Sequence, residues 1–294
     1  MTAPLILWLP GVEALAGAVA RGLDADLAGV ETRRFPDGES YVRLPVAVTG
    51  RRVVIVSSLA RPDERFLPLV FAAKTARDLG AVEVVLVAPY LPYMRQDARF
   101  RPGEAITSRH FAGLLSHAFD RLITIDPHLH RHRALAEIYA IPAEALRAAP
   151  LLGDWIAANV ERPLVIGPDA ESEQWAREVA RRAGAPHLVA SKQRLGDREV
   201  KVSLPPLDAW RDRRAVLIDD IAASGRTLIE AARGVAAQGL ERPDCVVVHA
   251  LFAEDAFDRL GEAARRVVST DTVAHASNAI SVAPLLIEAL RRPA

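Results

Sequence analysis

The sequence predicts two stacked α/β domains, each built on a mainly parallel sheet flanked by helices. Short apolar runs alternate with longer amphipathic stretches, as in strand–helix repeats that form parallel sheets with right-handed crossovers. The runs are β-branched and almost continuously apolar, as strands covered on both faces are. The length of 294 residues suits two α/β domains of ordinary size better than one small core.

The series of elements runs twice along the chain. Strands are expected at Leu5–Leu9, Val53–Ser57, Val82–Ala88, Leu122–Ile125, Pro163–Ile166, His187–Val189, Ala215–Ile218, Cys245–Ala250 and Val267–Ser269. Helices are expected at Glu13–Gly22, Asp63–Leu79, Thr107–Ala118, Leu152–Asn159, Glu171–Ala183, Gly225–Gln238, Ala253–Ala263 and Ala283–Arg291. A break at residues 141–150 separates the two runs, so we predict domains at residues 1–147 and 148–294. Functional residues should follow the carboxyl ends of strands.

The composition excludes several classes of protein. Lys plus Arg equals Asp plus Glu, at 37 each, so no general field attracts nucleic acid or an anionic membrane. The single cysteine, Cys245, excludes an internal disulfide framework and is expected to be a buried small side chain. No stretch reaches the roughly 18 apolar residues of a membrane span, and no targeting segment is visible, so the sequence predicts a cytoplasmic protein.

The strongest local signal follows the expected strand Ala215–Ile218. That strand leads into Asp219 and Asp220, then a short loop and a helix start at Ser224–Thr227. Free N–H groups at a helix start, with Ser and Thr hydroxyls, form a cradle for phosphate. Two adjacent carboxylates beside a phosphate make sense if they hold sugar hydroxyls or magnesium. The alternative is a Ser N-cap with solvated acids.

This segment resembles the phosphoribosyl-binding loop of the phosphoribosyltransferase-fold superfamily. The resemblance implies that Asp219 and Asp220 contact the ribose hydroxyls. It also implies that the 5-phosphate is held by Ala223, Ser224, Gly225, Arg226 and Thr227. The ribose-phosphate diphosphokinases of this superfamily usually carry an acid in place of Ala223 and a glycine in place of Arg226. Other members share both departures, so the phosphate site itself still stands.

The resemblance to the ribose-phosphate diphosphokinase family extends over nearly the whole chain and includes Phe35–Ser40. Here Pro-Asp-Gly predicts the tip of a hairpin, which alone needs no function. The resemblance implies that Phe35 stacks on the adenine of ATP in a neighbouring subunit. It also implies that Asp37 and Glu39 accept hydrogen bonds from adenine or order an arginine partner.

A second segment, Pro89–Thr107, follows a buried strand and contains several prolines, which predicts a shaped loop at the ligand end of a sheet. Its arginines supply positive charge for a polyphosphate, or are simply solvated. The loop resembles the ATP-binding loop of the family. Arg95, Gln96 and Asp97 are the specific matches, and Arg99 is a looser one.

Histidines gather after the strand that ends at Ile125. His128, His130 and His132 suggest a zinc site, but Pro127 argues against the continued strand that would align them. In the family, an Asp-x-His at this strand end supplies a histidine linked to magnesium, which implies that role for His128. We assign no role to His130.

Two segments in the second half complete the resemblance. Asp169 matches a metal- and diphosphate-site acid. The family follows that acid with a Gly-rich stretch, whereas here Glu171 and Glu173 lie in it and would repel diphosphate unless they point away. Residues 190–200 resemble the mobile catalytic loop, with Lys192 and Arg194 as the matching pair. Gly-Asp at 196–197 marks the turn of a hairpin.

The resemblance implies that the chain transfers the diphosphoryl group of ATP to the 1-hydroxyl of ribose 5-phosphate with Mg²⁺ as cofactor. If Phe35 and Glu39 serve a neighbour's site, the protein is at least a homodimer. Two alternatives stay open. A phosphoribosyltransferase would need only the Asp219–Thr227 loop, and a catalytically silent homologue would bind nucleotide without turnover. The departures at Glu171, Glu173 and Ala223 motivate the second alternative.

Overall fold

The computed structural model describes residues 3–99, 101–129, 131–167, 169, 172–194 and 200–292. At residues 192–194, 200 and 201 it describes only the backbone. The chain forms two compact units, Met1–Leu146 with Val282–Ala294, and Arg147–Ser281. The predicted α/β class with mainly parallel sheets is confirmed in both units.

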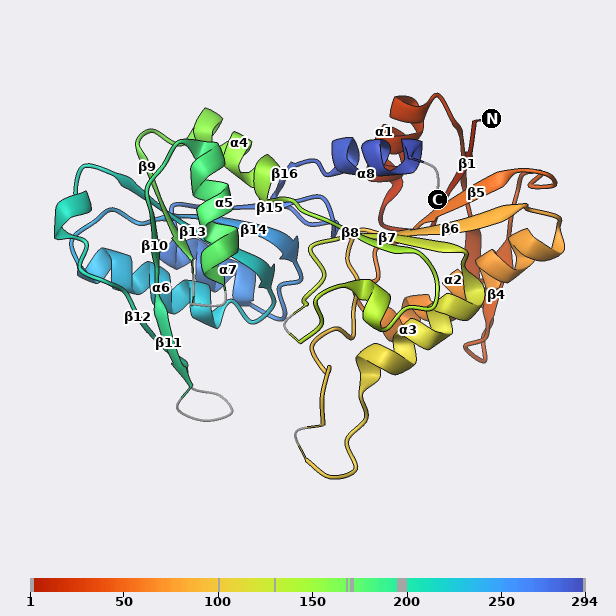
Figure 1. The fold of residues 1–294 in the computed structure, drawn as a ribbon, viewed down its shortest axis with the longest axis horizontal. Coiled ribbons are helices and arrows are strands. Elements are labelled where there is room, and N and C mark those ends of the chain that lie inside the picture. The colour runs from red at the N-terminus through yellow and green to blue at the C-terminus, as the bar shows by residue number, and fades with distance from the viewer. Residues whose placement is uncertain are drawn as a thin grey trace. The chain divides into compact units, whose positions relative to one another are not determined.

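The first unit is a six-stranded parallel sheet in the order β2-β1-β5-β6-β7-β8. Its strands are β1 (Leu5–Trp8), β2 (Asp26–Gly29), β5 (Arg52–Val56), β6 (Glu83–Ala88), β7 (Arg121–Ile125) and β8 (Ala143–Leu146). Helices α1 (Glu13–Leu23) and α8 (Ala283–Arg291) cover one face, and α2 (Pro62–Asp78) and α3 (Thr107–Ala118) cover the other (Figure 1). A separate antiparallel hairpin joins β3 (Glu31–Arg34) to β4 (Ser40–Arg43).

The second unit repeats this plan with the order β10-β9-β13-β14-β15-β16. Its strands are β9 (Pro163–Gly167), β10 (His187–Val189), β13 (Arg214–Ala222), β14 (Asp244–Ala250), β15 (Arg266–Thr270) and β16 (Asn278–Ile280). Helices α4 (Ala149–Asn159) and α5 (Glu173–Ala183) lie on one face, and α6 (Arg226–Ala237) and α7 (Ala256–Ala263) on the other (Figure 1). Its hairpin pairs β11 (Ser191–Arg194) with β12 (Val200–Ser203).

The two units therefore share one topology. Numbered by chain position within its unit, each sheet has the order 2-1-3-4-5-6, and each hairpin follows the second strand. In open parallel sheets, ligands bind beyond the carboxyl ends of the strands. Each unit consequently has one edge at which loops for a ligand should gather.

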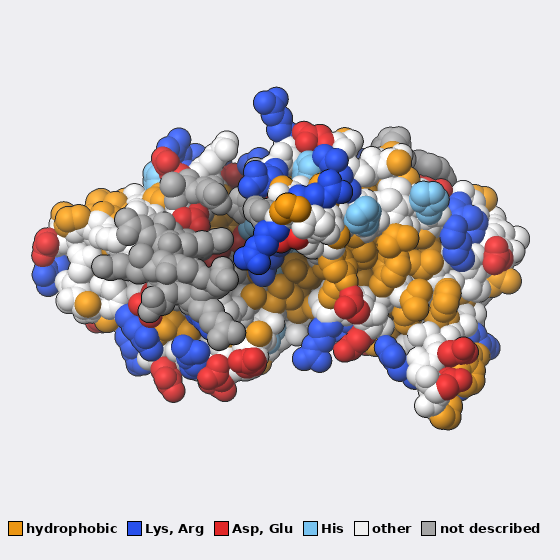
Figure 2. All heavy atoms as spheres, turned by 90° about the horizontal axis from the view of Figure 1, so that it is seen from below, with side chains coloured by type: hydrophobic (Ala, Val, Ile, Leu, Met, Phe, Trp, Pro, Cys, Tyr) orange, Lys and Arg blue, Asp and Glu red, His pale blue; other side chains and the backbone are white. Residues whose placement is uncertain are grey.

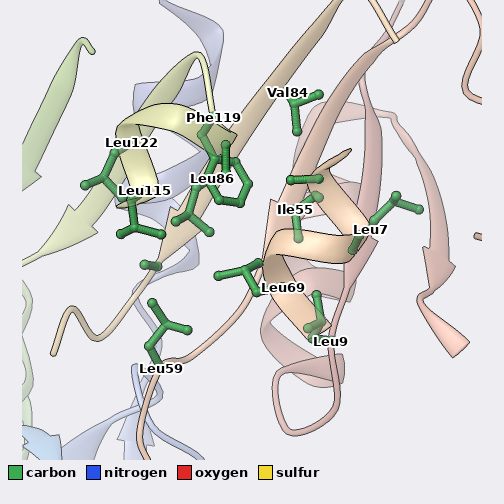
Figure 3. Packing of buried hydrophobic residues seen from close by; sticks show 14 of the residues in the cluster. Leu7, Leu9, Ile55, Leu59, Leu69, Val84, Leu86, Leu115, Phe119 and Leu122 are labelled. Carbon is green, nitrogen blue, oxygen red and sulfur yellow. The ribbon is translucent and has the colours of Figure 1, made fainter. Parts of the chain in front are cut away.

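Aliphatic side chains fill the space between sheet and helices. In the first unit, Leu7, Ile55 and Leu86 from three strands face Leu69 of α2 and Leu115 of α3, all at 1% exposure or less (Figure 3). Burying one such leucine stabilises the fold by about 1.5–3 kcal/mol. A rigid core of this kind fixes the strand ends that carry the loops described below.

Helix ends follow the local chemistry of the chain. Helix α2 begins with Pro62, whose missing N–H costs nothing at a helix start, and carries Asp63 and Glu64 in its first turn. Helix α5 ends at Gly184, which adopts the left-handed conformation with φ of 63°. The eight expected helices are all present within the described residues, with ends shifted by up to three residues.

The C-terminal helix belongs to the first unit. The predicted division placed residues 148–294 together, whereas the structure groups Val282–Ala294 with the N-terminal sheet. Arg121, only 5% exposed, donates to the carbonyls of Ala289 (3.2 Å) and Arg292 (3.1 Å) at the end of α8 and to Glu144 (3.0 Å). Arg52 donates to the carbonyl of Leu290 (3.2 Å). Two arginines of the first sheet thus hold this helix.

Candidate active site

Strand β13 (Arg214–Ala222) carries the two adjacent acids, Asp219 and Asp220, that precede the predicted phosphate-binding loop. The sequence predicts that the strand ends at Ile218, but it continues to Ala222, because Ile221 and Ala222 still pair with His249 and Ala250 of β14. Asp219 and Asp220 therefore lie inside the strand, near its carboxyl end, and are partly exposed. The N–H of Asp220 donates to the carboxylate of Asp219 (2.9 Å). The two carboxylates are held next to the loop that follows.

The phosphate loop, Ala223–Thr227, opens helix α6. Helix α6 begins at Arg226 and its N-cap is Gly225, at φ 65° and ψ −2°, where the sequence suggested Ser224 as a possible cap. No side chain within the described residues caps this helix start. The first N–H groups of a helix lack partners within the helix, and the helix dipole adds partial positive charge. The start of α6 is therefore suited to a phosphate group.

Gly225 is the residue whose replacement tests this loop. An added Cβ would lie 3.5 Å from the carbonyl oxygen of Ala256, an ordinary contact, so the cost of Gly225→Ala comes from its positive φ. That cost is about 1–2 kcal/mol. The loop can relieve this strain by rotating its backbone, which moves the N–H groups at the helix start away from the 5-phosphate. The KM for ribose 5-phosphate should then rise about tenfold. Steady-state kinetics would measure this rise.

The matched control is Gly184→Ala in the same unit. Gly184 has nearly the same φ, 63°, and nothing lies within 4 Å of an added Cβ. It should lower the melting temperature similarly while leaving KM unchanged. Equal KM values for the two variants would contradict a phosphate role for the α6 start.

The segment after β14 supports the phosphate loop, and the sequence analysis did not single it out. The N–H of Leu251 donates to the carbonyl of Ala222 (3.0 Å), and the N–H of Ala253 donates to the carbonyl of Ala223 (3.0 Å). The sequence could have indicated this role, because the segment directly follows a buried strand that lies next to β13 in the sheet. The phosphate loop is thus fixed from one side by backbone hydrogen bonds.

In the first unit, the predicted ATP loop follows β6 and is anchored in the core. Met94 is 2% exposed. The ring of Tyr93 packs on Phe111 of α3, with centroids 4.8 Å apart, and its hydroxyl donates to Asp63 of α2. This hydrogen bond, together with burial, raises the pKa of Tyr93 to about 12. The loop therefore has a defined base from which its polar residues project.

The three matched residues of this loop have different surroundings. Arg95 is exposed, and no ion pair involves it within the described residues. Gln96 accepts from the hydroxyl of Thr107 (3.1 Å) at the start of α3, so it shapes the loop. Asp97 pairs with Arg131 (3.2 Å) from the loop after β7. Arg95 is consequently the residue of the three that is available to a polyphosphate.

The hairpin predicted at Phe35–Ser40 is confirmed between β3 and β4. The N–H of Gly38 donates to the carbonyl of Phe35 (2.9 Å), and the N–H of Glu39 donates to the carboxylate of Asp37 (3.1 Å). Phe35 is 38% exposed. The guanidinium of Arg33 lies over its ring at 4.6 Å from the centroid. An exposed aromatic ring with two acids nearby is thus displayed at the tip.

The loop after β7 carries the predicted metal-linked histidine. His128 is partly exposed three residues beyond the strand end, and Asp126 adopts a positive φ of 33°. His130 lies outside the described residues. Nδ1 of His132 lies 3.2 Å from the carboxylate of Glu137, whose pKa is lowered by a bond from the Arg133 N–H and by His132. His132 is therefore engaged within its own loop.

Asp169 lies at the start of α5 in the second unit. Its carboxylate accepts from the N–H of Ser172 (3.1 Å), and the Ser172 hydroxyl donates to the Asp169 carbonyl (2.6 Å). Glu173 accepts from Arg177 (2.6 Å) one turn later. Part of the expected repulsion of diphosphate is thereby offset by a neighbouring cation. Glu171 lies outside the described residues.

The predicted catalytic lid has the backbone of a hairpin. Strands β11 and β12 pair antiparallel, with Lys192 opposite Val202 and Arg194 opposite Val200. The predicted Gly-Asp turn at 196–197 and the side chains of Lys192 and Arg194 lie outside what the structure describes. The hairpin form expected from the sequence is therefore present in its two strands.

Other expectations concern the whole chain. Cys245 is buried as predicted, and burial raises the pKa of its thiol. Within the described residues no three potential metal-binding side chains gather. Among the described helices, none combines the length and apolar character that a membrane crossing requires.

The repeated parallel sheets, together with the paired acids and glycine-capped helix start at the end of β13, define a protein of the phosphoribosyltransferase fold. Residues 5–118 match the model for the N-terminal domain of ribose phosphate pyrophosphokinase, and residues 134–277 match the phosphoribosyl transferase domain. A ribose-phosphate pyrophosphokinase of Methanopyrus kandleri is 39% identical over 280 residues, covering 94% of each chain. The chain belongs to the ribose-phosphate pyrophosphokinase family.

Two further relatives agree with this assignment. The ribose-phosphate pyrophosphokinase of Methanothermobacter thermautotrophicus is 34% identical, covering 98% of this chain and all of its own. The crystal structure of phosphoribosylpyrophosphate synthetase from Mycobacterium smegmatis superimposes with a TM-score of 0.84 at 25% identity, covering 98% of both chains. The similarity thus includes both units and their hairpins.

Proposed function

We propose that the loops described above carry out the reaction of this family. The enzyme uses ATP to convert ribose 5-phosphate into phosphoribosyl pyrophosphate, and AMP is released. The 1-hydroxyl oxygen forms a bond to the β-phosphorus of ATP, the hydroxyl proton is lost, and the bond from that phosphorus to the α-phosphate bridging oxygen breaks. Such transfers depend on positioning and charge stabilisation more than on covalent catalysis.

The start of α6 carries the proposal for the sugar phosphate. The N–H groups at the start of α6, after Gly225, would donate hydrogen bonds to the 5-phosphate, with the hydroxyls of Ser224 and Thr227 beside them. Asp219 and Asp220 would accept hydrogen bonds from the ribose hydroxyls. Ala223 and Arg226 complete the loop in this proposal. A carboxylate pair next to a phosphate cradle matches a ligand that carries both hydroxyls and a phosphate.

The proposed ATP site uses the first unit. Exposed Arg95 would bind the phosphates, where a guanidinium can contact two oxygens at once. Gln96 and Asp97 would act next to it while holding the loop in shape. Phe35 would stack on adenine, and the acids of its hairpin, Asp37 and Glu39, would orient the base.

Mg²⁺ is the proposed cofactor. Asp169 offers a carboxylate oxygen, the ligand type that Mg²⁺ prefers. The family resemblance also links His128, in the loop after β7, to magnesium. Such a site requires only one or two carboxylates, because water and substrate phosphates complete the shell. Bound Mg²⁺ would offset charge on the phosphate oxygens. Asp169 already accepts from the Ser172 N–H, which fixes its carboxylate.

A homo-oligomer of at least two subunits is also proposed. Helices α2 and α3 expose Leu67 (53%), Phe71 (43%) and Leu114 (54%), and apolar side chains gather on the face shown in Figure 2. Phe35 and Phe71 line one shallow surface pocket between the β3–β4 hairpin and α2. Exposed apolar patches are typical of protein contacts, which supports a role for this hairpin beside a neighbouring subunit. A cytoplasmic location stays a prediction from the sequence.

Release of AMP tests the proposed reaction. The purified protein with ATP and Mg²⁺ should form AMP only when ribose 5-phosphate is added, and removal of Mg²⁺ with a chelator should stop it. Chromatographic separation of AMP, ADP and phosphoribosyl pyrophosphate would measure this. ATP binding without AMP release would indicate the silent homologue, and consumption of phosphoribosyl pyrophosphate with a free base would indicate a transferase.

A further inference from the structure

We infer that His275, acting through Phe252, positions the phosphate loop for ribose 5-phosphate, an inference that rests on the proposed function. Neither residue is part of the proposed binding machinery, and both lie in the second unit. Three sets of contacts connect them to that loop: a cluster of rings, backbone hydrogen bonds, and a buried hydroxyl network.

The ring cluster consists of Phe252, Phe257 and His275. The His275 ring lies 5.0 Å from Phe252 and 4.6 Å from Phe257, the latter at 78°. Phe252 and Phe257 are 5.3 Å apart. Tilted and edge-to-face pairs at such distances stabilise beyond the burial of their area. The ring of His275 thus touches both aromatic residues of the β14–α7 region.

The backbone around Phe252 contacts the phosphate loop directly. The residues on either side of it, Leu251 and Ala253, donate to the carbonyls of Ala222 and Ala223, both at 3.0 Å. A displacement of the Phe252 ring therefore pulls on two hydrogen bonds to the strand end and loop that carry the phosphate site. Phe252 is the side chain located between these two donors.

The segment that carries His275 is itself rigid. Thr270 and Thr272 both donate to the carbonyl of Val248 (2.8 and 3.1 Å), and Thr272 contacts Nδ1 of buried His249 (2.9 Å). These groups are fully buried or nearly so. A buried network whose members are hydrogen-bonded rigidifies the structure around it. The loop after β15 is consequently a fixed support.

His275 has a defined ring orientation on this support. Its Nδ1 accepts from the N–H of Ser277 (3.2 Å) and lies 2.8 Å from the Ser277 hydroxyl. Ser277 in turn bonds Ser269 of β15 (2.7 Å). Burial lowers the pKa of His275, so the imidazole is neutral near pH 7. A neutral, oriented ring packs against phenylalanine without the cost of burying a charge.

The effect should appear as weaker binding of one substrate. The phosphate loop should bind the 5-phosphate equally in the ground state and in the transition state. Disturbing such a loop raises KM and leaves kcat unchanged. Loss of the ring contacts in His275→Ala should raise the KM for ribose 5-phosphate about threefold to tenfold. The KM for ATP should stay within about twofold, because the proposed ATP residues lie on other loops.

The experiment compares His275→Ala, Phe252→Ala and His275→Phe in the full-length enzyme. His275→Phe keeps a ring in the cluster and loses only the two side-chain hydrogen bonds to Ser277, so it should restore most of the affinity. Trp155→Ala is the control: it removes a half-buried ring, covered by Arg266 at 4.6 Å, near the amino end of β15. It should lower stability without changing KM.

Calorimetric titration with ribose 5-phosphate separates this inference from the proposed reaction. If the wild-type protein binds ribose 5-phosphate but releases no AMP, the reaction fails while the Kd values of the variants still test the positioning. Wild-type affinity in both alanine variants would overturn the inference, even if both melt earlier. So would equal losses for ATP and ribose 5-phosphate, or no recovery in His275→Phe. A wild-type protein that binds no ribose 5-phosphate would overturn both.

Discussion

Replacing Lys192 by alanine is expected to lower kcat about a hundredfold to a thousandfold. The transferring diphosphoryl group gathers negative charge in the transition state, and a cation that closes on it acts like an oxyanion donor, worth about 2.7–4 kcal/mol. Lys192 lies on strand β11 of the lid hairpin. Because the cation would act mainly in the transition state, the KM for ribose 5-phosphate should change little.

Initial rates of AMP formation at saturating substrates would measure the loss of kcat. Lys201→Ala is the matched control, since it removes a lysine from the opposite strand of the same hairpin, where residue 201 pairs with Gln193. It should keep nearly full turnover. A Lys192→Ala enzyme with normal kcat would show that the lid assignment is wrong, whichever way Lys201→Ala behaves.

Arg121→Ala should destabilise the first unit by about 2–4 kcal/mol, because it leaves two largely buried carbonyl oxygens without their charged donor. Its side chain is 6% exposed, and its guanidinium donates to Glu144 and to the carbonyls of Ala289 and Arg292. Without this side chain, two backbone carbonyls at the end of α8 lose a hydrogen-bond donor in a mostly buried site. Helix α8 should then detach more often from the sheet.

Urea unfolding would give the change in the free energy of unfolding, and hydrogen exchange would locate it. Amides of Ala283–Arg291 should exchange faster, whereas those of β13 and β14 should be unchanged. Arg77→Ala is the control, because Arg77 and Asp120 form an ion pair with both side chains almost 40% exposed, worth about 0–1 kcal/mol. Equal losses in the two variants would contradict a special role for Arg121.

The central strands and the helices could be predicted because their signals are local. Continuous apolar runs such as the one ending at Ile125 identify strands buried on both faces. The strands β2, β8 and β16 were missed. They are three or four residues long, lie at sheet edges and are partly exposed, so residues such as those of Asp26–Gly29 show neither a long apolar run nor clear alternation.

Long-range partners could not be read from the sequence. Helix α8 can be predicted from its own residues. Its position beside the first sheet, however, depends on Arg52 and Arg121, which lie more than 160 positions earlier in the chain. The pairing of Asp97 with Arg131 is of the same kind. Motif residues such as Asp219 and Gly225 were found because a strand end and a helix start are local features, whereas their roles remain proposals.

The return of α8 to the first unit has a consequence for synthesis on the ribosome. The sheet of the first unit is translated before residues 147–281, but α8, which covers one of its faces together with α1, is translated after them. Domains generally fold as units during synthesis, from the N-terminus onward. Here the first unit can be completed only last: part of one apolar face of its sheet, beside α1, stays uncovered while Arg147–Ser281 is made and folds. Until Ala283–Arg291 is made, that part of the face remains open to solvent on the growing chain.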